Sequence, residues 1–295
     1  MSVPEALKAH LQSGATQMCR AWELKRRDGV RLGFTDHDLD LRFDDLVFHA
    51  DTGLTSVALE QTTGLSVDNT EAMGVLSHVS VSEADIEAGR FDGAEVLAWT
   101  VNWSDVSQRV LRFRGTLGEI RRSGGVFKAE LSGLTERLNQ AQGRIYQKTC
   151  SALLGDAACG FDAKAPGYHW RGFVTAVEDR RMLAFDDLSG FDEGWFDRGR
   201  IEVLSGAAKG LVGLVKTDRV IAGRRDVELW EPLRAAVAVG DEVLLQAGCD
   251  RRMETCRAKF NNLLNFRGFP HIPGEDWLMT SPAGGTANNG GSMNK

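Results

Sequence analysis

The sequence has no apolar run approaching the roughly 18 residues of a membrane-spanning helix, which excludes an integral helical membrane protein. Its first residues lack the basic start and apolar stretch of a secretory signal, so we expect a protein made in a reducing cytoplasm. Lysine and arginine total 35 against 41 acidic residues, which argues against a basic groove for nucleic acid. A Gly-rich phosphate loop, a nucleophile elbow and a His-Glu-x-x-His motif are also missing, so we predict no enzyme.

What the sequence does contain is typical of a globular protein. Hydrophobic residues make up 42% of the 295 positions and charged residues 26%, which excludes wholesale disorder, collagen and coiled coil. At about 150 residues per domain, the length predicts two domains. Glycine is abundant, at 33 residues against 6 prolines, which indicates many tight turns between short strands.

Alternating apolar and polar residues predict strands in both halves of the chain. In the first half they cover 21–26, 30–34, 39–43, 75–81, 95–103, 110–116 and 126–131, with hairpin turns at Asp28-Gly29 and Gly124-Gly125. In the second half they cover 169–177, 181–187, 201–204, 211–217, 227–230 and 242–246. Helical spacing occurs at 3–13, 134–142 and 255–264. We therefore predict a mainly β protein with few short helices and two sandwich or barrel-like domains, 1–145 and 146–280, followed by a flexible tail at 281–295.

Four of the five cysteines form two local pairs that are far apart in the sequence. Cys150 and Cys159 end the first half, and Cys249 and Cys256 follow about ninety residues later. The pairs can meet only if the region between them folds back on itself. Four thiolates in one pocket would repel one another unless a cation neutralised them, and zinc or an iron–sulfur cluster would do so.

The spacing leaves three interpretations of these cysteines open. Structural zinc usually takes pairs with two to four intervening residues, whereas eight and six intervening residues fit a larger cluster better. Nearby Gly155, Gly160 and Gly248 would let backbone amides approach sulfur. The third interpretation is four reduced cysteines packed as small hydrophobic side chains.

Other groups of reactive residues have simpler explanations. The acidic stretch from Thr35 to Asp40, with His49 and Asp51, could hold a divalent ion, but we interpret it as a solvated turn. Cys19 is predicted to be a buried thiol. The short basic patches Lys25-Arg26-Arg27, Arg224-Arg225 and Arg251-Arg252 are interpreted as solvated turns or partner contacts.

Several stretches together resemble a known family. The C-terminal one comprises Gly248-Cys249-Asp250, Cys256, Phe260 and Asn262, followed by Asn265-Phe266, Gly268-Phe269-Pro270 and Ile272-Pro273-Gly274. The others are Leu32–Asp38, Cys150–Gly160, Glu231-Pro232-Leu233 and Val239-Gly240-Asp241. This pattern is similar to the baseplate hub proteins of phage tails and gene transfer agents, which are distantly similar to the tail-tip protein L of phage lambda.

The resemblance implies a structural tail-tip hub. Such a hub is expected as a homotrimer that joins the hexameric tail tube and distal tail ring to the threefold central fibre protein. It would line the channel through which DNA leaves without specific binding. A net charge of −6 suits such a wall, although the alternative is that this charge only aids solubility. The expected location is the cytoplasm of the producing cell during assembly, then the tail tip of the released particle.

The resemblance also implies a cofactor. It is an iron–sulfur cluster, [4Fe-4S], with Cys150, Cys159, Cys249 and Cys256 as its ligands, and zinc is the alternative metal. The cluster would cross-link the two cysteine pairs of the C-terminal domain. The alternative functions are an iron–sulfur redox protein and a zinc-containing interaction protein.

Overall fold

The computed structural model describes residues 3–50, 69–74, 82–123, 126–133, 143, 145–186 and 188–272. The chain divides into two compact units, Met1–Gln142 and Gly143–Lys295. There is one eight-stranded and one seven-stranded sheet, with a few short helices, which confirms the prediction of a mainly β fold. Within the described ranges, no helix is both long enough and apolar enough to cross a membrane.

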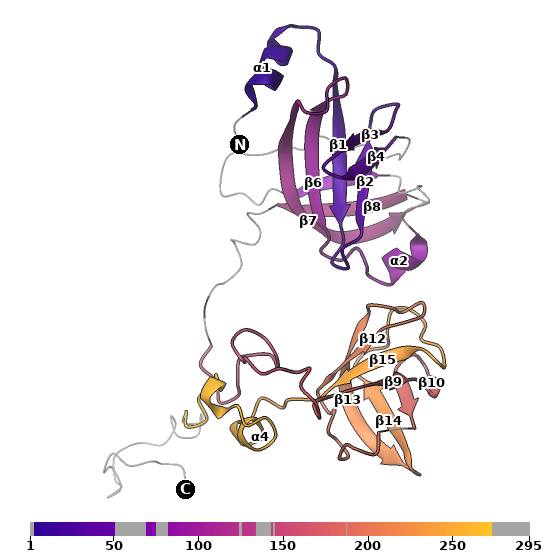
Figure 1. Cartoon of the computed structure of the whole chain (residues 1–295), viewed down its shortest axis with the longest axis vertical. Helices are drawn as coiled ribbons and strands as arrows, with labels where there is room; N and C mark the ends of the chain where they lie inside the picture. The colour runs from indigo at the N-terminus through magenta and orange to yellow at the C-terminus, as the bar shows by residue number, and fades with distance from the viewer. Residues whose placement is uncertain are drawn as a thin grey trace, which may run out of the picture. The chain divides into compact units, whose positions relative to one another are not determined.

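The N-terminal unit holds the eight-stranded sheet, with the strand order β3-β4-β2-β1-β6-β7-β8-β5 (Figure 1). Helix α1 (Glu5–Gln12) precedes the first strand, and α2 (Glu83–Glu87) precedes β6. The strands are β1 (Met18–Lys25), β2 (Arg31–Thr35), β3 (Leu41–Phe43), β4 (Leu46–His49), β5 (Asn69–Gly74), β6 (Glu95–Asn102), β7 (Arg109–Ser123) and β8 (Val126–Gly133). Neighbouring strands are antiparallel except β2 and β4, which are parallel.

The predicted turn at Asp28-Gly29 connects β1 and β2. Gly29 has a φ of 88°, a conformation that favours glycine, and the Arg26 N–H donates to the Val30 carbonyl at 2.9 Å. This turn sets a register in which Leu24 pairs with Leu32. Alternate residues of the hairpin then face a buried cluster whose members include Trp22, Leu24, Phe34, Val96 and Phe113.

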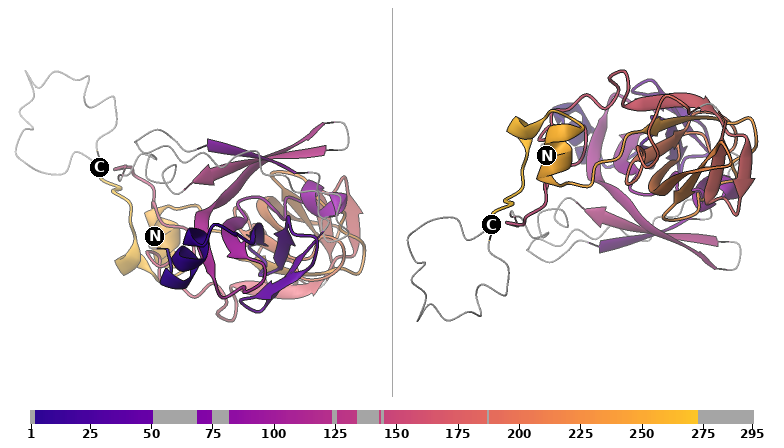
Figure 2. Two further views of the ribbon diagram at one scale, coloured as in Figure 1. Left: turned by 90° about the horizontal axis from the view of Figure 1, so that it is seen from above. Right: turned by 90° about the horizontal axis from the view of Figure 1, so that it is seen from below.

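Strand β7 belongs to two parts of the sheet. Its first half pairs with β6, and its second half continues past that strand and pairs with β8, with a bulge between Leu117 and Ile120. Strand β5 then pairs with the other edge of β8. The three strands therefore form a ribbon that extends beyond the rest of the sheet (Figure 2).

The C-terminal unit holds the seven-stranded sheet, with the order β10-β11-β14-β13-β12-β15-β9. Its strands are β9 (His169–Phe173), β10 (Ala176–Glu178), β11 (Met182–Phe185), β12 (Arg200–Val203), β13 (Val212–Ile221), β14 (Arg224–Leu229) and β15 (Glu242–Gln246). The strands at the two ends of this order, β9 and β10, are consecutive in the chain. Between them, the Val174 N–H donates to the Asp241 carbonyl just before β15, and the Thr175 N–H donates to the Ala184 carbonyl in β11. The two ends of the sheet are therefore joined, and the sheet closes into a small barrel.

Inside the barrel, inward-facing side chains of several strands form one apolar core. Phe185, Ile201, Val215, Leu229 and Leu245 are all fully buried in it. Because side chains alternate along a strand, the neighbours of these residues point to the outside. The alternation that predicted these strands therefore also identifies the side of each strand that faces the core.

Two predictions about local structure are wrong. A continuous helix at 255–264 is replaced by α4 (Met253–Ala258) and the 3-10 helix η1 (Leu263–Asn265), because Asn261 adopts a left-handed φ of 46° between them. The basic patches are not wholly solvated: Arg26 is buried and pairs with Asp85 at 3.1 Å, and Arg225 is also buried. In both cases a carboxylate compensates the buried charge.

Some predicted elements lie outside the described residues. They are the strand at 75–81, the turn at Gly124-Gly125, the helix at 134–142 and the tail at 281–295.

Candidate functional site

The four paired cysteines meet at one cavity of the C-terminal unit. Cys150 and Cys159 come from the segment that precedes β9, Cys249 follows β15, and Cys256 belongs to α4. All four line the same cavity, together with Ala152, Leu154, Arg251, Phe260, Asn262 and Asn265. None of them forms a disulfide.

The barrel explains why segments so distant in the sequence come together. Strands β9 and β15 are antiparallel neighbours, so the start of β9 lies beside the end of β15, where His169 pairs with Gln246. The adjoining Ala247 N–H donates to the Tyr168 carbonyl at 2.8 Å, and the Cys150 N–H donates to the Arg251 carbonyl at 2.8 Å. The segment before β9 and the segment after β15 therefore leave the barrel together.

An aromatic cluster supports the cavity from the side of α4. Phe161 contacts both Tyr168 and Phe260 edge to face, with centroid distances of 4.7 and 5.0 Å. The Tyr168 hydroxyl donates to the Lys259 carbonyl at 2.9 Å. These contacts fix the segment that carries Cys159 against the segment that carries Cys256.

Three of the four sulfurs accept hydrogen bonds from N–H groups. The Arg267 N–H donates to Cys150 at 3.3 Å, the Arg251 N–H to Cys249 at 3.4 Å, and the Asn262 side-chain amide to Cys159 at 3.5 Å. Two of these donors are backbone amides, as expected, and Gly155 and Gly160 occupy positive-φ positions in turns of the segment that carries Cys159. Hydrogen bonds of this kind stabilise negative charge on sulfur.

Burial favours the neutral thiols in the metal-free protein. It raises the pKa of Cys256 to about 11, and it also raises the pKa of Cys249. The neighbouring thiols at the cavity raise both pKa values further, because adjacent thiolates would repel one another. A cation at the cavity would remove that repulsion, and binding it would release protons.

The side-chain arrangement itself does not define a metal site. In the part of the chain that is described, no group of three or more His, Cys, Asp or Glu side chains is placed to hold a metal ion. The metal cluster that was predicted as part of the fold is therefore not shown by the arrangement of these side chains.

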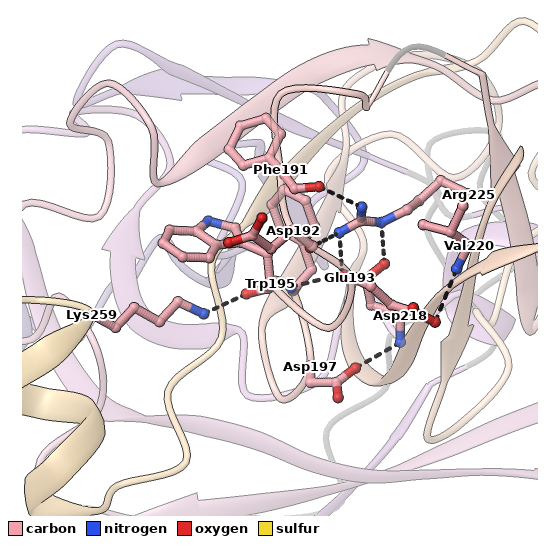
Figure 3. A network of polar contacts seen from close by, with 10 residues as sticks. Phe191, Asp192, Glu193, Trp195, Asp197, Asp218, Val220, Arg225 and Lys259 are labelled. Atoms are coloured by element: carbon pink, nitrogen blue, oxygen red, sulfur yellow. Dashed lines mark hydrogen bonds and ion pairs between the residues drawn. The ribbon is translucent and has the colours of Figure 1, made fainter. Parts of the chain in front are cut away.

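Lys259 connects the cysteine segment to the barrel. Its ammonium donates to the Trp195 carbonyl at 2.5 Å (Figure 3) and lies 4.3 Å from the centre of the Trp195 ring. The same ammonium also donates to the Gly248 carbonyl at 3.0 Å. Burial lowers the pKa of Lys259, and this shift would be opposed by negative charge on Cys249, if it were a thiolate, and on Asp197.

The loop that receives Lys259 is held by a buried ion pair. Arg225 binds the Asp218 carboxylate through two nitrogens, one of them at 2.7 Å, and donates to the carbonyls of Phe191 and Asp192 (Figure 3). Asp218 accepts the Phe196 N–H at 2.9 Å. The pair fixes the loop, and the loop in turn positions the Trp195 carbonyl for Lys259.

We expect Lys259→Met to destabilise the C-terminal unit by about 2 kcal/mol, because two carbonyls lose a charged donor. The free energy of unfolding of the full chain in urea measures this loss. Lys216→Met is the matched control: Lys216 lies near the surface, bonds to Glu228 at 2.9 Å and faces the Trp230 ring. Its loss should cost less than about 1 kcal/mol, and equal costs would contradict the role assigned to Lys259.

The remaining candidate residues have local roles. In the acidic stretch, Asp36 accepts the Arg20 N–H at 2.6 Å and His37 accepts the Leu39 N–H at 3.0 Å, as in a turn held by its own side chains. Asp51 lies outside the described residues. Cys19 is buried, as predicted, and burial raises its pKa to about 11.

Sequence reasoning did not identify Lys259 and Asn262 as site residues. Lys259 falls within the predicted helix at 255–264, where a lysine is expected to face solvent. Asn262 belongs to the stretch that carries the family resemblance, but it also falls within the predicted helix at 255–264, which gave no sign of its contact with sulfur. Only the separation of α4 from η1 brings its side chain to Cys159.

Comparisons with known proteins cover almost the whole chain. A family model described as "Baseplate hub protein, N-terminal attachment domain" matches residues 4–162, and one described as "Phage conserved hypothetical protein BR0599" matches residues 194–276. Among solved structures, a chain from the virion of a native gene transfer agent particle is 53% identical, with a TM-score of 0.91, over 98% of this chain and 99% of that chain. A search of curated proteins finds no match. The first family model includes one cysteine pair, and the second includes the other.

Proposed function

This chain belongs to the baseplate hub protein family, and we propose that it is the structural tail-tip hub of a phage or gene transfer agent particle. The match to a gene transfer agent virion chain at 53% identity, over nearly the full length of both chains, is the observation that carries this proposal. It agrees with the resemblance found in the sequence. In this role the chain is a structural component of the particle rather than an enzyme.

The proposed hub is a homotrimer. Its two units contain sheets of similar size, with eight and seven strands. Three copies would present six comparable surfaces, which lets a threefold assembly meet a sixfold ring. One side of the trimer would bind the distal tail and tail tube proteins, and the other would bind the central fibre protein. DNA would pass through the channel without specific binding.

The proposed cofactor is an iron–sulfur cluster, [4Fe-4S], held by Cys150, Cys159, Cys249 and Cys256. Two observations support it: all four thiols line one cavity, and three of the sulfurs accept N–H donors. Zinc needs four ligands at about 2.0–2.3 Å from a single ion, whereas the ligands of a cluster stand farther apart. When bound, the cluster would supply a covalent cross-link between the segments before β9 and after β15.

The hub proposal predicts a trimer and a defect at the tail tip. The purified chain should have the mass of three copies by size-exclusion chromatography with light scattering. Particles from cells that lack the chain should have tails without a central fibre by electron microscopy, and adding the purified trimer should restore it. A monomer in solution, together with normal tips in the deletion strain, would contradict the proposal.

A further inference from the structure

Asn262 contacts two cysteines that lie on different segments of the chain. Its side-chain amide donates to the Cys159 carbonyl at 2.7 Å and to the Cys159 sulfur at 3.5 Å. Its backbone N–H donates to the Cys256 carbonyl at 3.0 Å, and its own carbonyl accepts from the Cys256 thiol at 3.3 Å. One residue therefore links cysteines that are ninety-seven positions apart.

The orientation of the Asn262 amide is fixed by its neighbours. The Asn265 side-chain NH2 donates to the Asn262 Oδ1 at 2.8 Å, so the oxygen faces a donor and the nitrogen faces the Cys159 carbonyl. The residue before it, Asn261, has a φ of 46° and turns the chain out of α4. The left-handed turn at Asn261 therefore places the Asn262 side-chain amide within reach of the Cys159 sulfur.

We propose that Asn262 is the positioning residue of the four-cysteine site, and that its side-chain amide holds the Cys159 sulfur in place relative to Cys256. The inference rests on the proposed function in that these cysteines are the ligands of the proposed cluster. Asn262 acts through Cys159 and Cys256 and is not itself a ligand.

A bound metal cluster would change the two sulfur contacts in opposite directions. The cysteines would bind as thiolates, with their protons released to solvent, so the bond from the Cys256 thiol to the Asn262 carbonyl would be lost. The amide bond to Cys159 would become stronger, because its acceptor would then carry negative charge. The side-chain donor is therefore the contact that matters in the loaded protein.

The test uses the full-length chain, purified without oxygen, with three variants. N262L removes the amide donor without adding charge, and N262D replaces the donor by a carboxylate that faces the Cys159 carbonyl. N261D is the matched control, because the Asn261 side chain is exposed and aspartate tolerates its left-handed backbone. Iron and sulfide per chain and the midpoint potential are measured for each.

We expect N262L and N262D to retain no more than about a third of the iron that N261D retains. The remaining cluster should have a more negative midpoint potential, because hydrogen bonds to sulfur raise that potential. Iron content and potential equal to those of N261D in both variants would overturn the inference.

Hydrogen exchange on the metal-free chain separates this inference from the cluster proposal. The amides of residues 152–160 should exchange about tenfold faster in N262L than in N261D, because the link from Asn262 to Cys159 is lost. If the parent chain contains no iron, the cluster proposal is rejected but the inference about Asn262 is not. The exchange rates then test the role of Asn262 by themselves. Equal rates in N262L and N261D would overturn it.

Discussion

We expect the replacement of Cys249 and Cys256 together by serine to remove the iron of the proposed cluster and to prevent incorporation of the chain into particles. Serine oxygen is a poor substitute for thiolate at an iron–sulfur cluster, so iron per chain should fall by about tenfold or more. The binding free energy of a structural metal site is also folding free energy, and its loss should loosen the segments at 145–168 and 249–272. The N-terminal unit has a separate core, whose members include Trp22 and Phe34, and should remain folded.

Iron analysis, visible absorption and hydrogen exchange measure these effects. Cys19→Ser is the matched control, because Cys19 is a buried thiol of β1 whose sulfur donates to the Val101 carbonyl in the N-terminal unit. This variant should keep its iron and its ability to assemble. If the double variant melts and assembles as the parent does, the cross-linking role is wrong. If the parent contains zinc in place of iron, the site is the zinc-containing alternative.

Local signals in the sequence predicted much of the fold. The Asp28-Gly29 turn fixes its hairpin through chemistry contained within a few residues, and the alternation at 242–246 depends on one buried side of one strand. The second half of β7 is different. It leaves β6 to pair with β8, and which neighbour a strand chooses depends on residues far away in the sequence.

The candidate site was only partly predictable for the same reason. Cysteine is rare enough that two separated pairs draw attention, but the reason they meet is the pairing of β9 with β15. Arg224 and Arg225 look alike in the sequence. Because side chains alternate along β14, Arg224 points outward and Arg225 points into the unit toward Asp218. No local pattern shows which of two adjacent arginines will be buried.

Arg225 and Asp218 form the most deeply buried ion pair in the part of the chain that the structure describes. The Asp218 side chain is 0% exposed and that of Arg225 is 4% exposed. The pair is bidentate, and further hydrogen bonds join Arg225 to the carbonyls of Phe191 and Asp192 and Asp218 to the Phe196 N–H. Removing one partner would leave a charge without water and without its counter-ion.

We therefore expect Arg225→Met to destabilise the C-terminal unit by about 3–5 kcal/mol, since an unpaired buried charge costs that much. The double variant Asp218→Leu with Arg225→Met should recover a large part of this loss, because it removes both charges. Urea unfolding of the full chain, followed by tryptophan fluorescence, gives the four free energies of the double-mutant cycle. Loss of the pair should also release the loop that receives Lys259, and so lower iron retention.

Arg224→Met provides the matched control on the same strand. Arg224 is half exposed and pairs with Asp226 at 2.8 Å, so solvent reaches the guanidinium although the Asp226 side chain is only 8% exposed. Its loss should therefore cost about 1–2 kcal/mol, less than that of the buried Arg225. A cost for Arg225→Met no larger than that for Arg224→Met would show that the buried pair does not hold the loop. The Arg225–Asp218 pair would then not stabilise the cysteine segments through Trp195 and Lys259.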